Sequence, residues 1–363
     1  MLKYIFFFIL LLHGLIHGLG FAKAYGYGTI TLLTREISKA NGVCWLISAA
    51  LFLSVAFPYF FKNVHWPYLA VVAVVFSQIL IVTVWNDAKY GTILNGIILI
   101  SAIVSWAAIH FEDKFKEDVK RHFTQTVFSN EDMLTENDII RLPAPVQQYI
   151  RYSGAMNKPK VKNMRIVFDG EMREKGKDFF KFHSEQYNFF DEPTRLFFMK
   201  ANMFGTTVPG YHRYQNATAT MQVKLLGLLN MVNMKGNEMN QAETVTVFND
   251  MCLMAPASLI DNRIEWTLLD SLTAKATFTN GINKISANLY FNEKGQLVNF
   301  ISDDRYEINA MQRYRFSTPV KEYVQMNGRM VWKQGETRWL YPDGEFVYGK
   351  FTLKGVDYNV SDF

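Results

Sequence analysis

Cysteine is scarce in this chain, occurring only as Cys44 and Cys252 among 363 residues. Two cysteines cannot build a disulfide framework, and neither has another cysteine or a histidine nearby at the spacing of metal ligands. We therefore expect no bound metal. The cysteine content does not identify a cellular compartment, because a domain without disulfides is tolerated on either side of a membrane.

Several common catalytic motifs are also missing. The sequence contains no P-loop, no dinucleotide-binding glycine fingerprint after a strand, no G-x-S-x-G elbow and no H-E-x-x-H helix. Residues 131–363 carry 28 lysines and arginines against 27 acidic residues, and this near neutrality argues against a nucleic-acid partner. We expect no cofactor, and we assign no residue a catalytic role from a motif.

Four long apolar runs stand out in the first third of the chain. They cover about residues 2–21, 43–61, 66–85 and 91–109. Each is close to the roughly 20 residues that a helix needs to cross the apolar core of a bilayer. Tryptophans lie near the ends of the runs, as expected for side chains at membrane interfaces. The sequence therefore predicts a four-helix transmembrane bundle over residues 1–110.

The short segments that flank these runs indicate an orientation. Six lysines and arginines lie on the side that holds both termini, and four lie on the opposite side. Because positive charge concentrates on the cytoplasmic side, this difference favours a cytoplasmic location for both termini and for the large C-terminal part.

Two histidines interrupt the first apolar run. His13 and His17 are four residues apart, so they share one face of a helix. The link between the third and fourth runs lies on the same side of the membrane and supplies Asp87, Lys89 and Asn95. This polar cluster is consistent with hydrogen bonding between helices, with an ion or proton site, or with a haem or metal site. The last is the least favoured, because the other runs place no histidine at a matching depth.

Beyond the bundle, residues 111–130 predict a charged juxtamembrane helix and linker, and residues 131–363 predict a β-rich globular domain. We count about nine to eleven strands, and one sheet of that size curls. The expected fold class is therefore α+β, with the bundle followed by an antiparallel, curved, half-barrel-like sheet and a few helices. The clearest of these helices begins at Pro145 and ends at Gly154.

The clearest strand pair surrounds Asn280-Gly281, a strong signal for a two-residue hairpin turn. With both residues in the turn, Leu272 lies opposite Leu289, Ala274 opposite Ala287, and Ala276 opposite Ile285. Both strands then present apolar residues on the same face, which indicates a sheet buried on one side.

Two apolar segments are expected to lie across the sheet, residues 221–236 and a helix over residues 242–260 that ends at Pro256. Half of the sixteen methionines fall between residues 199 and 254. Methionine fills irregular cores and also lines surfaces that accept varied apolar partners. This pattern fits a filled core or a cavity for a lipid-like molecule, in which case Met221, Met231 and Met234 are candidate contacts. A sheet interior filled by its own side chains would exclude the cavity.

Polar candidates for such a cavity come from two strands. Alternation along residues 180–189 places His183, Glu185 and Tyr187 on one face. If that face lines a cavity, these residues are its best polar contacts. Arg305, in the segment "SDDRY", could hold an anionic head group if it is buried and paired with a carboxylate. The alternative, which the sequence favours, is a solvated charge at the end of a strand.

Several segments together resemble an uncharacterised bacterial family of membrane proteins, classified as a domain of unknown function. They are "LPAPVQQYIRYSG", "VPGYHRY", "MQVKLLGLLNMV", "IEWTLLDSLTAKATF" and "DGEFVYGKFTLKGVDYNV". The resemblance implies a bacterial inner-membrane protein with a four-span front end and a β-rich domain. A curved sheet of this kind is also similar, at the level of fold, to the half-barrels of lipoprotein carriers.

The function that these features favour is a membrane-anchored module that binds a hydrophobic or lipid-like ligand in its sheet domain. One alternative is a membrane enzyme that acts on such a ligand through His183, Glu185 and Arg305. Another is a sensor or scaffold that responds to protons. The expected partners are the bilayer and a hydrophobic small molecule or lipid, and the sequence leaves the oligomeric state open.

Overall fold

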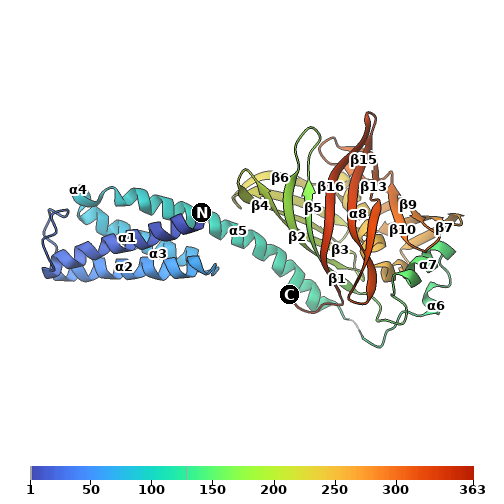
Figure 1. Cartoon of the computed structure of the whole chain (residues 1–363), viewed down its shortest axis with the longest axis horizontal. Helices are drawn as coiled ribbons and strands as arrows, with labels where there is room; N and C mark the ends of the chain where they lie inside the picture. Colours follow the sequence, from blue (N-terminus) through green and yellow to red (C-terminus); the bar gives the residue numbers. More distant parts are fainter. Residues whose placement is uncertain (1, 128) are drawn as a thin grey trace. The chain divides into compact units, whose positions relative to one another are not determined.

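The computed structural model describes residues 2–127 and 129–363, and Figure 1 shows the course of the chain. Residue 128, within the predicted linker, lies outside the described residues. The chain divides into two compact units. The first comprises residues 1–111 with residues 226–228, and the second comprises residues 112–225 and 229–363.

The first unit is helical. Its elements are α1 (Leu2–Tyr25), α2 (Lys39–Phe60), α3 (Trp66–Thr83), the short α4 (Trp85–Ala88) and the start of α5 (Gly91–Gln125). Four helices, α1, α2, α3 and α5, are long and apolar enough to cross a membrane. The prediction of four apolar spanning segments is therefore confirmed, with boundaries that differ by a few residues.

Helix α5 is longer than the apolar run that predicted it, because its charged second half continues the helix without a break. Residues 112–125 belong to the second unit. In this part, Phe115 and Val119 are buried, and the Phe115 ring lies 5.6 Å from that of Tyr211. An amphipathic stripe thus replaces the uniformly apolar surface of the spanning part.

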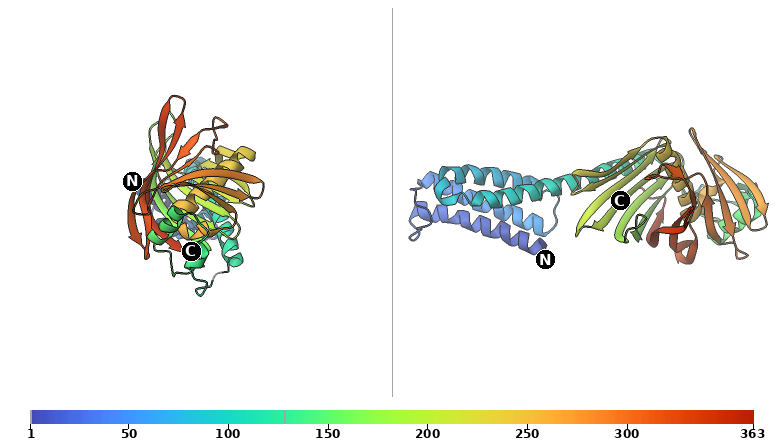
Figure 2. Two further views of the ribbon diagram at one scale, coloured as in Figure 1. Left: turned by 90° about the vertical axis from the view of Figure 1, so that its right-hand side faces the viewer. Right: turned by 90° about the horizontal axis from the view of Figure 1, so that it is seen from above.

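The second unit is built on one large sheet. Its strands are β1 (Asn163–Met172), β2 (Phe180–Phe189), β3 (Thr194–Met203), β4 (Thr206–Gln215), β5 (Thr218–Leu225), β6 (Leu229–Lys235), β7 (Ile264–Asp270), β8 (Thr273–Asn280), β9 (Asn283–Phe291), β10 (Leu297–Ser302), β11 (Tyr306–Glu307), β12 (Gln312–Arg313), β13 (Arg315–Ser317), β14 (Val320–Met326), β15 (Arg329–Tyr341) and β16 (Gly344–Tyr358). Fourteen of them form the sheet, in the order β6-β5-β4-β3-β2-β1-β16-β15-β13-β10-β9-β8-β7, with β14 paired to β15. The pairs are antiparallel, and the sheet is curved without closing into a barrel (Figure 2). The predicted fold class is confirmed, although the expected number of strands was too low.

Besides residues 112–125 of α5, three helices accompany the sheet within the described residues of the second unit: α6 (Glu136–Ile139), α7 (Ala144–Tyr152) and α8 (Asn237–Met254), followed by the 3-10 turn η1 (Pro256–Ile260). Helix α7 lies where Pro145 and Gly154 predicted it, and Gly154 adopts a left-handed φ of 68° that ends the helix. Helix α8 is buried over most of its surface and packs on the sheet, with the Phe248 ring stacked on that of Phe278. The face of the sheet that α8 covers is called the inner face below.

Residues 221–236 do not lie across the sheet, and that prediction was wrong. They form most of β5 and β6, which pair with each other in register. In β5, Met221, Val223 and Leu225 alternate with Gln222 and Lys224, which is the period of a strand, but the high apolar content of the whole segment obscures that pattern.

The β8–β9 hairpin is present, but its register differs from the prediction by two residues. Ala274 pairs with Leu289 and Ala276 with Ala287, because Asn280 pairs with Asn283. The turn therefore consists of Gly281 and Ile282, with Gly281 at a φ of 60°. Glycine takes the first turn position, as in a type II′ turn. Since side chains alternate with a period of two, the predicted apolar face is nevertheless correct.

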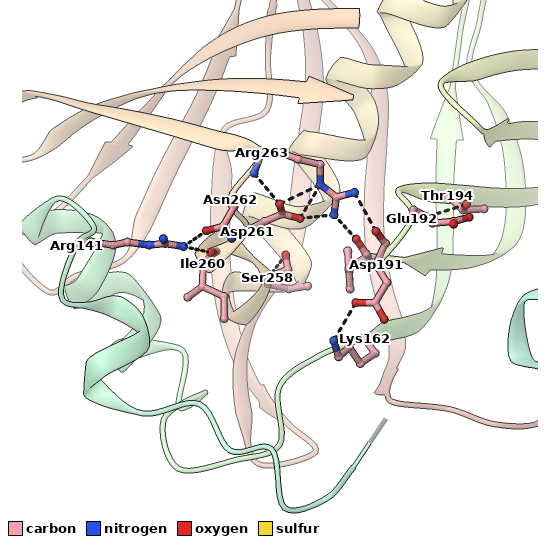
Figure 3. A network of polar contacts seen from close by, with 12 residues as sticks. Arg141, Lys162, Asp191, Glu192, Thr194, Ser258, Ile260, Asp261, Asn262 and Arg263 are labelled. Carbon is pink, nitrogen blue, oxygen red and sulfur yellow. Dashed lines mark hydrogen bonds and ion pairs between the residues drawn. The ribbon is translucent and has the colours of Figure 1, made fainter. Parts of the chain in front are cut away.

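A polar network fixes the segment that follows α8 (Figure 3). Arg263 forms an ion pair with Asp261 and donates to the backbone oxygen of Asp191, in the turn between β2 and β3. Arg141, which follows α6, donates to the backbone oxygen of Ile260, 2.8 Å away. These contacts join the end of η1 to the β2–β3 turn and to the segment after α6, and so hold the C-terminal end of α8 in place against the sheet.

Candidate functional site

A cavity of about 130 Å³ lies between α8 and the inner face of the sheet. Its lining comes from β1 to β4, α8, the segment around Arg305, and β13 to β16. The remaining interior is filled by α8 and by core side chains such as Phe248 and Phe300, both fully buried. The sheet therefore encloses a small cavity and not the wide apolar one that a long acyl chain requires.

One side of the cavity is apolar. Phe168, Met199, Leu253, Trp332 and Phe351 are among its lining residues. They come from β1, β3, α8, β15 and β16, so the apolar wall depends on the curvature that brings both halves of the sheet around the helix. Such a wall favours the apolar part of a ligand.

A buried charge network also lines the cavity. Arg195 on β3 donates to Asp250 over 2.8 Å and to Glu243 over 3.2 Å, both carboxylates being on α8. The same guanidinium donates to Gln186 on β2 over 3.0 Å. Only 8% of Arg195 is exposed, so these contacts supply nearly all of its solvation.

The two carboxylates of this network have shifted pKa values in opposite directions. Burial raises the pKa of Asp250, and the nearby Arg195 and the amides of Asn188 and Gln186 only partly offset that effect. Burial also acts to raise the pKa of Glu243, but His212 and the Arg195 charge outweigh it and lower this pKa to about 2. Glu243 is therefore a permanent anion at neutral pH.

Arg305 is the second arginine in the cavity wall, and its surroundings differ from those of Arg195. It donates to the hydroxyl of Tyr348 over 2.9 Å and to that of Thr246 over 3.3 Å. Its guanidinium lies 4.4 Å from the ring centroid of Phe316 and 5.0 Å from that of Trp339. Among the described residues, no carboxylate lies within ion-pair distance of it. The cavity thus presents one arginine whose charge is balanced by neighbours and one held by hydroxyls and aromatic rings.

Helical spacing explains how α8 contributes its polar side chains. Glu243 and Asp250 are seven residues apart, and Thr246 and Leu253 follow the same stripe, so all four point to one side of the helix. The side of α8 that carries Phe248 packs into the core. Buried polar side chains need hydrogen-bonding partners, which Arg195 supplies to Glu243 and Asp250, while Thr244 and Asn249 bond to Tyr214 and Thr318.

The predicted polar contacts on β2 lie on the opposite face of the sheet. Glu185 and Tyr187 both accept from Arg165, at 2.7 and 3.1 Å. His183 is exposed and pairs with Asp169 over 2.8 Å. The cavity is lined instead by Gln186, which has the other orientation. Residues 112–125 of α5 cover the face of Tyr187, which is why no cavity forms there.

The predicted methionine contacts also lie outside the cavity. Met221 and Met234 pair across β5 and β6 and pack against the core, and Met231 is exposed. The cavity is lined by Met172, Met199 and Met254 instead. Of the seven predicted cavity residues, only Arg305 lines it.

Sequence reasoning missed Arg195, Gln186, Glu243 and Asp250. The stripe on α8 is a readable signal, but the same spacing is common on helices exposed to water. Its partner Arg195 lies 48 residues before Glu243, and only the folded sheet brings the two together.

In the first unit, the structure brings together part of the predicted polar cluster. His13 Nε2 donates to the side-chain oxygen of Asn95 over 2.9 Å. His17 Nδ1 donates to the backbone oxygen of His13, so its Nε2 accepts from Ser77, 2.9 Å away. Asn95 also donates to Ser77 over 3.0 Å. This chain of hydrogen bonds links α1, α3 and α5 without requiring a charged imidazole.

The other two members of that predicted cluster lie apart from the network. Asp87 lines a 290 Å³ cavity beside His13, yet its carboxylate accepts from the backbone and hydroxyl of Thr34. Lys89 does not line this cavity, and its amino group lies over the ring of Tyr90.

Two further features bear on what kind of site the second unit holds. A larger cleft of about 570 Å³ shares Gly335, Glu336 and Phe351 with the cavity, but it is more open to solvent. Two of its four lysines, Lys321 and Lys354, pair with carboxylates. No group of three or more potential metal ligands was found in the part of the chain that the structure describes. The cavity between α8 and the sheet, which contains the buried Arg195 network, is therefore the stronger candidate.

Comparison with known proteins gives a family and two distant structural likenesses. The model of a family of unknown function, DUF6544, matches residues 132–351. A crystal structure of a LolA-superfamily protein from Nitrosomonas europaea is 7% identical with a TM-score of 0.35, and the match covers 59% of this chain and 94% of that chain. A β-barrel-like protein from Brucella abortus, from the family of unknown function DUF1849, is 9% identical with a TM-score of 0.17, covering 55% of this chain and 99% of that chain. Comparison with curated proteins gave no significant match.

Proposed function

This chain belongs to the family of unknown function DUF6544, and from that premise we propose that its second unit binds a small amphipathic anion in the cavity between α8 and the inner face of the sheet. The observation that carries the proposal is the position of Arg305. Its guanidinium lines a partly apolar cavity and is held by hydroxyls and rings. No carboxylate lies within ion-pair distance of it among the described residues, although Glu243, Asp250 and Glu336 line the same cavity. A buried or half-buried charge without a partner is costly, and an anionic ligand would supply that partner.

The size of the cavity limits the apolar part of the ligand. A cavity of about 150 Å³ in another protein accepts benzene, and the volume here is about 130 Å³. One aromatic ring or a chain of a few carbons therefore fits beside Met199 and Trp332. A long-chain lipid would have to displace part of α8, so we narrow the predicted lipid-like ligand to a short amphipathic anion.

Binding of hexanoate, compared with hexanol, tests this function in the full-length protein in detergent. We expect hexanoate to bind and Arg305→Gln to weaken it by roughly ten- to a hundredfold, as expected for the loss of a charge-assisted hydrogen bond. Hexanol, which has no charge, should be insensitive to that substitution. Arg315→Gln is the matched control, because Arg315 is exposed and pairs with Asp303. Equal affinity of both arginine variants for hexanoate, or no binding to the parent protein, would refute the proposal.

The three residues of the alternative enzyme hypothesis do not share a site. His183 and Glu185 lie on the outer face of the sheet and Arg305 lines the inner cavity. No step that uses all three can therefore be written. Binding, with Arg305 as the anion contact, is the function that the geometry supports.

We also propose that the chain is a multi-pass protein of a bacterial inner membrane, with residues 131–363 in the cytoplasm. The four apolar helices support the membrane assignment, and the excess of lysine and arginine on the side of the termini supports the orientation. A single cysteine introduced at Lys294, an exposed turn position in the second unit, provides the test in a Cys44→Ser background. Labelling of Lys294→Cys in intact cells by a reagent that cannot cross the membrane would overturn the orientation.

A further inference from the structure

Large apolar side chains are exposed in two turns of the sheet. Phe204, between β3 and β4, is 75% exposed. Leu226 and Leu228, in the turn between β5 and β6, and Leu229 at the start of β6 are exposed as well. Turns in contact with water usually carry glycine and short polar residues, so these side chains need an explanation.

The backbone of both turns is strained in a way that polar residues would relieve. Phe204 and Leu226 both have a φ of 54°, in the left-handed region that bulky residues disfavour. Asparagine occupies this conformation at Asn216 and Asn327, in two other hairpin turns of the same sheet. Strain of this kind persists where a side chain has a use. In these two turns the sequence retains an apolar side chain in place of the better-suited residue.

Strand pairing places the two turns at the same end of the sheet. Met203 pairs with Thr206 and Leu225 with Leu229, so each turn caps its hairpin, and β4 and β5 lie side by side between them. We call this group of exposed side chains the apolar rim; its members are Phe204, Leu226, Leu228 and Leu229.

Contacts within the second unit show which end of the sheet this is. Glu112 on α5 pairs with Lys200 over 2.6 Å. Ten residues further along the helix, His122 packs against Phe189, with ring centroids 4.9 Å apart. Phe189 pairs with Thr194, at the opposite end of β3 from the rim. The helix segment therefore runs along the sheet with Glu112 nearest the rim.

Helix α5 is continuous, and its apolar part, a candidate membrane span, precedes Glu112. Glu112 is therefore both the end of residues 112–125 that continues into the apolar part of α5 and the end that lies nearest the rim. From this direction and from the chemistry of the turns, we propose that the apolar rim inserts into the interface of the bilayer that the four helices span. This inference does not depend on the proposed anion site.

Depth measurements with spin labels test the proposal in the full-length protein, reconstituted into vesicles of phosphatidylcholine and phosphatidylglycerol. Single cysteines replace Phe204 or Leu228 in a Cys44→Ser background, and Cys252 is fully buried and therefore protected. We expect both labels to be accessible to oxygen, which concentrates in the bilayer, and to lose accessibility to a water-soluble nickel complex.

Ile282 supplies the matched control. It is 90% exposed in the β8–β9 turn, and its neighbour Gly281 lies against Ala217. Ala217 precedes β5, whereas Leu226 follows it, so the eight residues of β5 separate control and rim by about 26 Å. A label at Ile282→Cys should remain accessible to the nickel complex.

Equal nickel accessibility at all three positions would overturn the proposal. Protection from both oxygen and nickel at the rim would also overturn it, because it would show that protein covers the rim. The double variant Phe204→Asn/Leu226→Asn tests the cause, since asparagine suits the left-handed backbone and should not impair folding. We expect this variant to restore nickel accessibility at a label on Leu228, while hexanoate binding in detergent stays unchanged.

Discussion

Replacement of Arg195 by methionine is the strongest test of the buried charge network. The substitution keeps much of the side-chain volume and removes three hydrogen bonds, to Asp250, Glu243 and Gln186. It leaves two buried carboxylates without their cation. Removal of one partner from a buried ion pair costs about 3–5 kcal/mol, so we expect the second unit to lose that much of its free energy of unfolding.

Cys252 provides the assay. This thiol is fully buried in α8, so in a Cys44→Ser background it reacts only when the second unit opens. Pulsed thiol labelling across a urea series gives the free energy of unfolding of this unit without interference from the bundle. Arg315→Met is the matched control, because Arg315 is exposed and its pair with Asp303 should contribute less than about 1 kcal/mol. A loss for Arg195→Met no larger than that of the control would refute the reasoning.

The pH dependence of this loss adds a second test. In the parent protein the lowered pKa of Glu243 contributes stability that is present above pH 4.5 and is lost as the pH falls toward 2. Without Arg195, the pKa of Asp250, which burial already raises, should rise further, and the pKa of Glu243 should rise from its lowered value. A raised pKa favours the folded state at low pH and disfavours it as the pH rises. The deficit of Arg195→Met should therefore shrink between pH 7 and pH 5.

Three further substitutions test other parts of the structure. Asn95→Leu breaks the hydrogen bonds that join α1, α3 and α5 and should lower the thermal stability of the bundle by about 1–2 kcal/mol, measured by helical circular dichroism in detergent. Tyr149→Phe removes the hydrogen bond to the Cys252 backbone oxygen and should cost about 1 kcal/mol in the thiol-labelling assay. Gly281→Val places a branched side chain at a φ of 60° and against Ala217, and should cost well over 1 kcal/mol by the same assay.

Features with a local cause could be predicted from the sequence. The four apolar helices follow from run length, because a bilayer demands about twenty apolar residues. Helix α7 follows from Pro145 and Gly154, whose backbone preferences fix its ends. The apolar face of the β8–β9 hairpin follows from alternation, although the exact partners did not, because the two-residue turn is Gly281-Ile282 instead of Asn280-Gly281.

The face of β2 that lines the cavity could not be predicted in the same way. Alternation separates Gln186 from Glu185 and Tyr187 but does not tell which set points inward. That choice depends on which helix covers each face. Residues 112–125 of α5 cover Tyr187, and α8 covers Gln186, and both contacts join segments far apart in the sequence. Both faces of β2 are covered, so burial along the strand carries little information about the cavity.

The two arginines of the cavity show why a site of this kind requires the folded chain. Arg195 lies in the apolar stretch "TRLFFMK" of β3, and the α8 stripe carries the acidic residues Glu243 and Asp250. The ion pairs between them balance the charge of the arginine and of both carboxylates. Arg305 follows two aspartates in sequence, and a local reading would pair it with them. In the structure, Asp303 pairs with Arg315 and Asp304 with Arg313. Arg305 instead turns toward Tyr348 and the cavity, where it forms no ion pair with the carboxylates that share the lining.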